Sequence, residues 1–226
     1  MDCGPKNSGF SLVELLCVIA IISTLTTFAA LGLVGSSQSG RIQQNVAQMA
    51  GLLAQSHALA LSQNTYVYVF FSASAPAPSS TTQVQLVVVY SATGLDVFQG
   101  TSGILDVGRD SSLLTLAHKR VTLDQAELLP KSEVPQALVN RPQPDSLADL
   151  GQESYQLTFQ NQTYDRVLIF RPNGVVAIPQ ANSSLSFPSL VEFALEPASA
   201  GATINPLAYV IQVAGTTGQA NVYRAQ

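Results

Sequence analysis

A single carboxylate inside a long apolar run is the feature that most constrains this chain. From Leu12 to Val34, Glu14 is the only charged side chain, and most other residues are aliphatic or small. A helix of about 20 residues, rising about 1.5 Å per residue, crosses the hydrocarbon core of a bilayer. A carboxylate at the middle of such a helix costs about 2.5 to 3.5 kcal/mol, and less near an interface. The run therefore predicts a transmembrane helix whose carboxylate needs a partner.

The residues before the run are arranged differently from an ordinary secretory signal, in which the cleavage site follows the apolar stretch. Residues 1–9 are a short polar leader with Lys6 as its only base, and the small residue Gly9 ends it. Cleavage after Gly9 would leave the whole apolar helix on the mature chain. It would also create an α-amino group on Phe10, four residues before Glu14.

Residues 9–16 (GFSLVELL), followed by the aliphatic residues 18–22, resemble the N-terminus of the type IV prepilin and pseudopilin superfamily. The resemblance implies that a prepilin peptidase cuts after Gly9 and that the new N-terminal Phe10 is N-methylated. It implies that Glu14 then contacts the amino terminus of a neighbouring subunit in a filament. The implied partners are the peptidase, other pilin or pseudopilin subunits and a membrane crossed once.

Electrostatics favours the same role for Glu14. An ammonium from the next subunit attracts the carboxylate far more strongly in a low-dielectric medium than in water. A charge that is costly alone becomes tolerable when it is paired, so pairing favours assembly and fixes its register. The alternative is an ordinary membrane anchor with a chance interfacial glutamate.

Orientation depends mainly on the type of leader, because one base on each side, Lys6 and Arg41, decides little. We expect the leader in the cytoplasm, one span of the bacterial inner membrane at residues 10–35, and the C-terminal domain in the periplasm. The protein would also be incorporated into a filament.

Residues 36–64 continue the helix with a different pattern. Apolar residues fall at positions 42, 46, 49, 53 and 60, widened by Leu52 and Leu59, which is the spacing of one helical stripe. We expect this amphipathic half to pack on a globular domain and to end near Gln63 and Asn64.

Residues 65–226 predict a β-rich domain. Asn173-Gly174 between apolar runs is a strong hairpin signal, because both residues tolerate positive φ. A proline-rich surface loop is expected at about residues 124–152, and turns and irregular chain at 91–108. The expected strands are residues 65–71, 83–90, one or two within 113–123, 155–159, 166–170, 175–178, 190–195, 207–213 and 220–224.

The end of the helix, residues 53–64, and two short segments of the β-rich domain, residues 169–174 and 211–224, resemble the H-type minor pseudopilin of type II secretion and the related minor pilins. Their spacing is also similar to protein D of the Verru_Chthon cassette, a group of prepilin-like proteins. The proline-rich middle is longer than a minimal pseudopilin needs.

Charge and cysteine content exclude some classes of protein. Only 11% of residues are charged and the net charge is −4, so nucleic acid is not an expected partner. The two cysteines, Cys3 and Cys17, leave no internal disulfide for the β-rich domain, which must be held by its core. We expect Cys17 to behave as a small buried hydrophobe.

No nucleophile elbow, phosphate-binding glycine loop or zinc-type Cys/His pair occurs in the sequence, and we expect no enzyme, cofactor or metal. Ser56 and His57 are adjacent on a helix, where side chains face about 100° apart, so His57 is expected to be structural or at the surface. Asp106 and Asp110 have the oxygen ligands that calcium prefers, but two loop acids are usually just solvated.

Two further features have ordinary explanations. The basic cluster His118-Lys119-Arg120 would touch DNA or an anionic surface in a DNA-uptake pilin, but we expect a solvated strand end. The sequons at Asn161 and Asn182 matter only in a glycosylating compartment.

These features together predict an α+β, pilin-like fold. A long N-terminal helix, transmembrane in its first half and amphipathic in its second, packs on a C-terminal antiparallel β-sheet domain. The expected function is a structural subunit, a pseudopilin or minor pilin, of a type II secretion or type IV pilus-like filament. The alternative is a tip adhesin or receptor that binds cargo, a surface or DNA.

Overall fold

In the computed structural model, backbone is described for residues 12–73, 83–99, 104–129, 141–142, 155–180, 184–198 and 207–224. Side chains of Val13, Glu14, Ala20 and residues 24–38 lie outside the described part, as does that of Ala73. The chain divides into two compact units, Met1–Arg41 and Ile42–Gln226, and each is described by itself.

Helix α1 extends from Leu12 to Gln63, so the boundary between the two units falls within it. The helix has no proline, and it ends where Asn64 adopts a left-handed conformation with φ of 47°. Asparagine tolerates this conformation better than most residues, which makes it a common helix terminator. The predicted end of the helix near Gln63 and Asn64 is confirmed.

The second unit contains three sheets. A six-stranded sheet has the order β10-β9-β8-β1-β2-β4, a four-stranded sheet the order β13-β12-β11-β5, and a three-stranded sheet the order β3-β6-β7. Neighbouring strands are antiparallel except for β3 and β6. The strands are β1 (Val67–Ala73), β2 (Gln83–Ser91), β3 (Leu105–Asp106), β4 (Leu114–Asp124), β5 (Ala126–Leu128), β6 (Leu157–Phe159), β7 (Gln162–Tyr164), β8 (Arg166–Phe170), β9 (Val176–Pro179), β10 (Leu185–Ser186), β11 (Leu190–Pro197), β12 (Tyr209–Ala214) and β13 (Ala220–Arg224).

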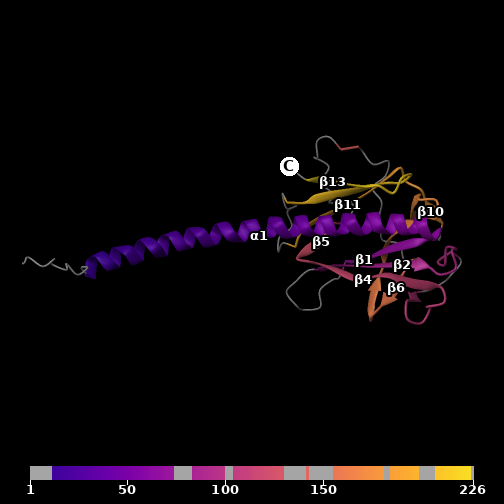
Figure 1. The fold of residues 1–226 in the computed structure, drawn as a ribbon, viewed down its shortest axis with the longest axis horizontal. Coiled ribbons are helices and arrows are strands. Elements are labelled where there is room, and N and C mark those ends of the chain that lie inside the picture. The colour runs from indigo at the N-terminus through magenta and orange to yellow at the C-terminus, as the bar shows by residue number, and fades with distance from the viewer. Residues whose placement is uncertain are drawn as a thin grey trace, which may run out of the picture. The chain divides into compact units, whose positions relative to one another are not determined.

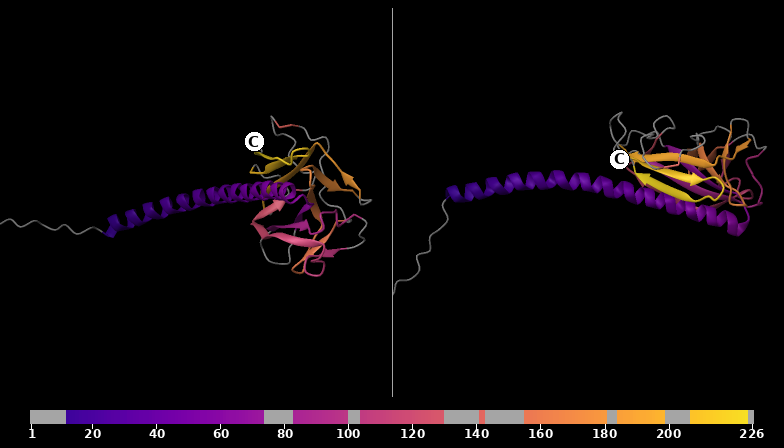
Figure 2. Two further views of the ribbon diagram at one scale, coloured as in Figure 1. Left: turned by 45° about the vertical axis from the view of Figure 1, so that its right-hand side comes forward. Right: turned by 90° about the horizontal axis from the view of Figure 1, so that it is seen from above.

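The C-terminal half of α1 lies between the two larger sheets and joins them into one core (Figure 1). In a view turned by 45°, the yellow strands again lie on one side of this helix and the pink and magenta strands on the other (Figure 2). The predicted stripe is confirmed, because its five positions are all buried, with Met49, Leu53 and Ala60 fully inaccessible. The core residues from the sheets are Val67, Val69, Phe71, Leu86, Val88, Leu168 and Phe170 on one side and Val191, Phe193, Leu195, Ile211 and Val213 on the other.

A second core covers the opposite face of the six-stranded sheet. Tyr68 and Phe70 of β1 point into it, whereas their neighbours Val69 and Phe71 point into the helix-containing core. Side chains of a strand alternate between faces, so a strand buried on both sides needs apolar residues at nearly every position. This explains why the sequence around β1 is continuously apolar or aromatic.

Most predicted strands are confirmed, with boundaries shifted by one or two residues. The region 113–123 forms one long strand, β4, rather than one or two short ones. The proline-rich loop expected from residue 124 is wrong at its start, because residues 126–128 pair with β11 as β5. Short strands β3, β7 and β10 were not predicted. The rest of that loop, residues 130–140 and 143–152, lies outside the described residues.

The predicted hairpin at Asn173-Gly174 is confirmed, with β8 and β9 antiparallel and Gly174 at φ of 80°. A second turn, between β12 and β13, places Gly218 at φ of 65°. Both glycines face His57 on α1. A Cβ on Gly218 would overlap the His57 Cδ2 atom, and a Cβ on Gly174 would come within 3.0 Å of Nε2. The two turns therefore close onto one helical side chain only because they lack side chains of their own.

Replacing Gly218 by alanine is expected to destabilise the β domain strongly. The left-handed conformation alone costs a non-glycine residue about 1 to 2 kcal/mol, and the overlap with His57 adds to this. Thermal unfolding of the full chain in detergent, followed by circular dichroism, measures the effect.

Gly51→Ala is the matched control, because a Cβ at Gly51 of α1 meets nothing within 4 Å. It should stabilise the helix by about 0.5 to 1 kcal/mol. Equal melting temperatures for the Gly218 variant and the wild type would contradict the packing described for His57.

Candidate functional site

The first turns of α1 carry apolar side chains on all sides. At about 100° per residue, the described exposed positions are distributed around the whole helix circumference. A helix that is apolar all round is typical of a segment buried in a membrane or in a bundle of helices. The exposed apolar side chains are Leu12, Leu15, Leu16, Val18, Ile19, Ile21 and Ile22.

Within the described residues, no helix combines the length and the apolar composition needed to cross a membrane.

The three residues to which the resemblance gives roles are close together in sequence at the start of this segment. Gly9 and Phe10 lie outside the described residues. Glu14 belongs to α1, although its side chain also lies outside the described part. The predicted cleavage site, methylation site and assembly carboxylate therefore stay predictions.

Two small polar side chains lie in the same segment. Cys17 is exposed in the single chain, so the prediction that it is buried is wrong for the isolated protein. The reason is that the neighbouring apolar side chains, such as Leu16 and Val18, are exposed as well. Ser23 donates its hydroxyl proton to the carbonyl oxygen of Ile19 at 2.8 Å, which satisfies a polar group on an apolar helix.

Comparison with protein families locates the recognisable part of the chain in this segment. Residues 4–30 match the model described as the prokaryotic N-terminal methylation motif. No curated protein and no solved structure matches the chain significantly.

The motif is consistent with the type IV prepilin-like superfamily and indicates a type IV pilin-like precursor. Such a motif suggests a structural, pilin-like protein. The motif implies processing by a peptidase, assembly with other pilin subunits and attachment to a membrane.

Ser56 and His57 do not form a catalytic pair. The Ser56 hydroxyl is fully buried and donates to the Leu52 carbonyl oxygen at 2.7 Å. The half-buried His57 ring packs on Phe170, with 5.7 Å between ring centroids. The structural role predicted for His57 agrees with these contacts.

The Asp106 and Asp110 carboxylates organise their own loop. Asp106 Oδ1 accepts from the amides of Gly108 and Arg109, at 2.8 and 3.0 Å. Asp110 Oδ2 accepts from the Asp106 amide at 2.8 Å and pairs with Arg109 at 3.2 Å. The amide of Asp106, followed by Arg109, lowers the pKa of Asp110. In the described part of the chain, no three acidic, histidine or cysteine side chains are grouped to hold a metal.

The contribution of Asp110 to stability should depend on pH. Because its pKa is lower in the folded chain than in the unfolded one, its contribution is fully present above about pH 4 and is lost as the pH falls through the folded pKa. The thermal stabilities of Asp110→Asn and wild type should therefore differ more at pH 7 than at pH 3. A difference that is the same at both pH values would contradict this role.

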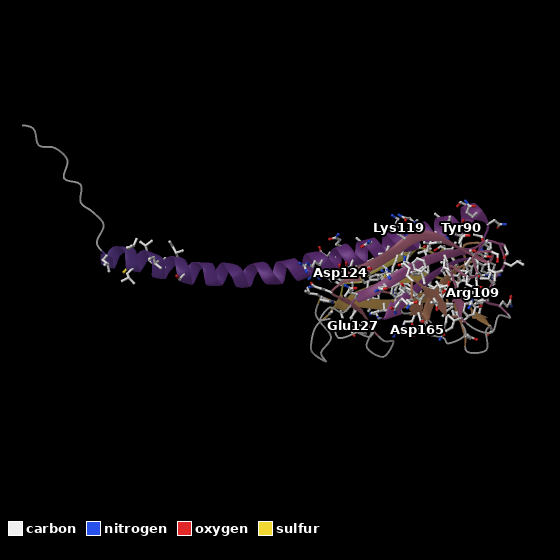
Figure 3. The ribbon with its side chains drawn as sticks, turned by 90° about the horizontal axis from the view of Figure 1, so that it is seen from below. Tyr90, Arg109, Lys119, Asp124, Glu127 and Asp165 are labelled. Carbon is white, nitrogen blue, oxygen red and sulfur yellow. The ribbon has the colours of Figure 1, made fainter. Side chains whose placement is uncertain are left out.

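The basic cluster lies within an edge strand rather than at a strand end, which corrects the prediction. Lys119 and Arg120 are exposed near the middle of β4, and His118 is partly buried beside Val88 of β2. Lys119 and Arg109 lie apart on the β domain (Figure 3). Among the described residues, Arg109 therefore does not extend the Lys119–Arg120 cluster into the basic stripe that a nucleic-acid surface needs.

The two sequons have different outcomes. Asn161 is exposed in the turn between β6 and β7, with φ of 65°, and Asn182 lies outside the described residues.

The sequence did not reveal a buried ion pair on the outer face of the four-stranded sheet. Arg141 donates from Nε and Nη2 to the two Glu192 oxygens, at 3.0 and 2.9 Å, and both side chains are fully buried. Gln212, opposite Glu192 in the β11–β12 ladder, donates to Glu192 Oε2 at 2.7 Å and to the Pro142 carbonyl at 2.8 Å. Arg141 therefore anchors part of the region expected to be only a surface loop. The available signal was an acid, Glu192, and an amide, Gln212, on two predicted strands that the structure pairs with each other.

Removing one partner of this pair should be far more damaging than removing both. Arg141→Met leaves a buried carboxylate without its cation and is expected to cost about 3 to 5 kcal/mol. The double variant with Glu192→Gln should recover most of that loss. A double-mutant cycle from thermal unfolding measures the coupling, and additive effects would contradict it.

The Asp96 carboxylate attaches the loop between β2 and β3 to the second core. Asp96 accepts from the hydroxyls of Tyr68 and Tyr155, at 2.8 and 3.1 Å. Burial, followed by the charge of Asp96, raises the pKa of both tyrosines. Both phenols therefore stay neutral hydrogen-bond donors, which suits a structural role rather than a nucleophilic one.

Arg171 of the predicted hairpin motif has an aromatic environment. Its guanidinium carbon lies 5.9 Å from the ring centroid of Tyr66 and 5.1 Å from that of Phe187. These cation–π contacts hold the end of β8 against the chain that follows β10.

Proposed function

We propose that this protein is a structural subunit, a pseudopilin or minor pilin, of a type II secretion or type IV pilus-like filament. One observation carries the proposal: the methylation motif at residues 4–30 includes the first turns of α1, where the described apolar side chains are exposed on every side. An exposed apolar segment of this kind needs lipid before assembly and neighbouring helices after it.

The proposed chemistry of maturation needs two residues. A prepilin peptidase cleaves after Gly9, and the new amino terminus on Phe10 is N-methylated. Residues 1–9 are then the leader and residues 10–35 the membrane anchor. Residues 36–64 continue the helix onto the β domain of residues 65–226. The leader lies in the cytoplasm, and the β domain lies in the periplasm of a bacterium.

Glu14 is the proposed assembly residue. It is the only charge between Leu12 and Val34, so in an apolar medium it lacks any partner from its own helix segment. The ammonium on Phe10 of a neighbouring subunit supplies the opposite charge. Their attraction grows as the dielectric constant falls, whereas the carboxylate alone carries a desolvation cost. The pair therefore forms only in the assembly, and only after cleavage.

Glu14→Ala tests this pairing. The variant should insert into the membrane as well as the wild type does, because it removes a charge. Its recovery in sheared or sedimented filaments should fall at least about tenfold, since each 1.4 kcal/mol of lost pairing energy changes the equilibrium constant tenfold. Carbonate extraction measures insertion, and immunoblotting of the filament fraction measures assembly.

Asp165→Ala is the matched control, because it removes an exposed carboxylate of the β domain between β7 and β8. It should assemble normally. Normal assembly of the Glu14 variant would contradict the pairing mechanism.

Mass spectrometry of the mature protein tests the maturation steps. Its N-terminal peptide should begin at Phe10 and carry one additional methyl group. A mature chain that retains residues 1–9 in cells with an active prepilin peptidase would refute the proposed cleavage. Co-purification with other pseudopilins and a secretion ATPase would then identify the machine.

A further inference from the structure

Outer strands of β-sheets carry unpaired backbone groups and are usually protected against pairing with other chains. Three of the four outer strands of the two larger sheets are protected. β10 has only two residues and β5 only three. β4 is long, but two register shifts interrupt its pairing with β2, and Lys119 and Arg120 are exposed on it. Shortness, bulges and charge each discourage the addition of a further strand.

The fourth outer strand, β13, lacks these features. Its five residues, Ala220–Arg224, pair with β12 without a register shift, and they include no proline or lysine. The one charge is that of Arg224 at the last position. Val222 is 42% exposed at the centre of the strand. Among the outer strands described for the two larger sheets, β13 is therefore the regular, unprotected edge.

The hydrogen bonds at the adjoining turn show which backbone groups of β13 face outward. The Ala214 amide donates to Gln219 O at 2.9 Å, and the Gly218 amide donates to Ala214 O at 2.7 Å. Residues along an antiparallel pair alternate between those that bond their partner and those that face away from it. Asn221 and Tyr223 therefore bond β12, whereas Ala220, Val222 and Arg224 direct their N–H and C=O groups to the free edge.

The free edge defines the chemistry of what can bind it. A row of alternating amide donors and carbonyl acceptors is complementary to another extended polypeptide. Val222 and Arg224 project from the same face, two residues apart. A strand laid beside them would place an apolar side chain next to Val222 and a carboxylate next to Arg224.

We propose that β13 is a docking edge, and that an extended segment of a different subunit of the same assembly adds to it as a further strand. The segment has an apolar residue and an acidic residue two positions apart. This inference rests on the proposed function and names a contact within the assembly beyond the Glu14 pair.

Val222→Pro tests the edge in the full-length chain. Proline removes the outward N–H and is tolerated on an outer strand where that N–H faces solvent. The melting temperature should stay close to that of the wild type. The amount recovered in the sedimented assembly should fall about tenfold, as expected from the loss of one backbone hydrogen bond.

Asn221→Pro is the matched control, because it removes an N–H that bonds β12. It should lower the melting temperature. Val222→Lys is the second variant, since it keeps every backbone group and adds a charge that disfavours strand addition. It should reproduce the assembly defect even if proline at position 222 disturbs the fold.

Hydrogen exchange measures directly whether the outward-facing amides of β13 are protected. In wild-type protein the amides of Val222 and Arg224 should exchange at least about tenfold more slowly in the assembly than in the detergent-dispersed chain, because strand pairing protects them. A photo-cross-linker at position 222 should then give a product that is not twice the mass of this chain.

Several results would overturn the inference. Unchanged exchange at Val222, together with normal assembly of both Val222 variants, would refute the docking edge and leave the Glu14 mechanism intact. A cross-linked product of twice the chain mass would assign the edge to a second copy instead. Equal protection before assembly would show that the chain covers its own edge. If the wild type forms no sedimentable assembly, the proposed function fails, and this inference fails with it.

Discussion

The burial of one helical stripe between two sheets is the interaction on which the β domain depends. Ile42, Val46, Met49, Leu53 and Ala60 contribute to a core whose other walls come from both sheets. Full burial of a large aliphatic side chain is worth about 1.5 to 3 kcal/mol, so this stripe is a major part of the domain's stability. The two glycine turns that close over the neighbouring His57 show how tightly both sheets approach the helix.

The two parts of α1 follow different physical rules. In the second unit, one face of the helix is apolar and buried while the other is polar, as in a helix packed on a domain. In the first unit, the apolar side chains described between Leu12 and Ile22 are exposed around the whole helix. Glu14 belongs to this segment in the sequence, where a charged group is favourable only if another molecule neutralises it. Its position is therefore an argument for assembly rather than catalysis.

Local patterns predicted the elements well, whereas contacts between distant segments escaped them. The helix end at Asn64, the hairpin at Asn173-Gly174 and most strands depend on nearby residues, and the structure confirms them. The Arg141–Glu192 pair joins residues 51 positions apart, and no local sequence pattern predicts this contact. Strand β5 was missed because prolines and charges around it mask three residues that become a strand only by pairing with β11.

The sequence by itself determined the character of the N-terminal segment, because a lone carboxylate in an apolar run and a small residue before it are properties of consecutive positions. It also determined which face of the amphipathic half is buried, since helical periodicity can be read directly. Tertiary structure alone decided that the helix serves two sheets at once and that β13 is an unprotected edge while β4 is not. Those features depend on which strands become neighbours. Hydrogen bonding between two strands produces no periodic pattern in the sequence of either strand.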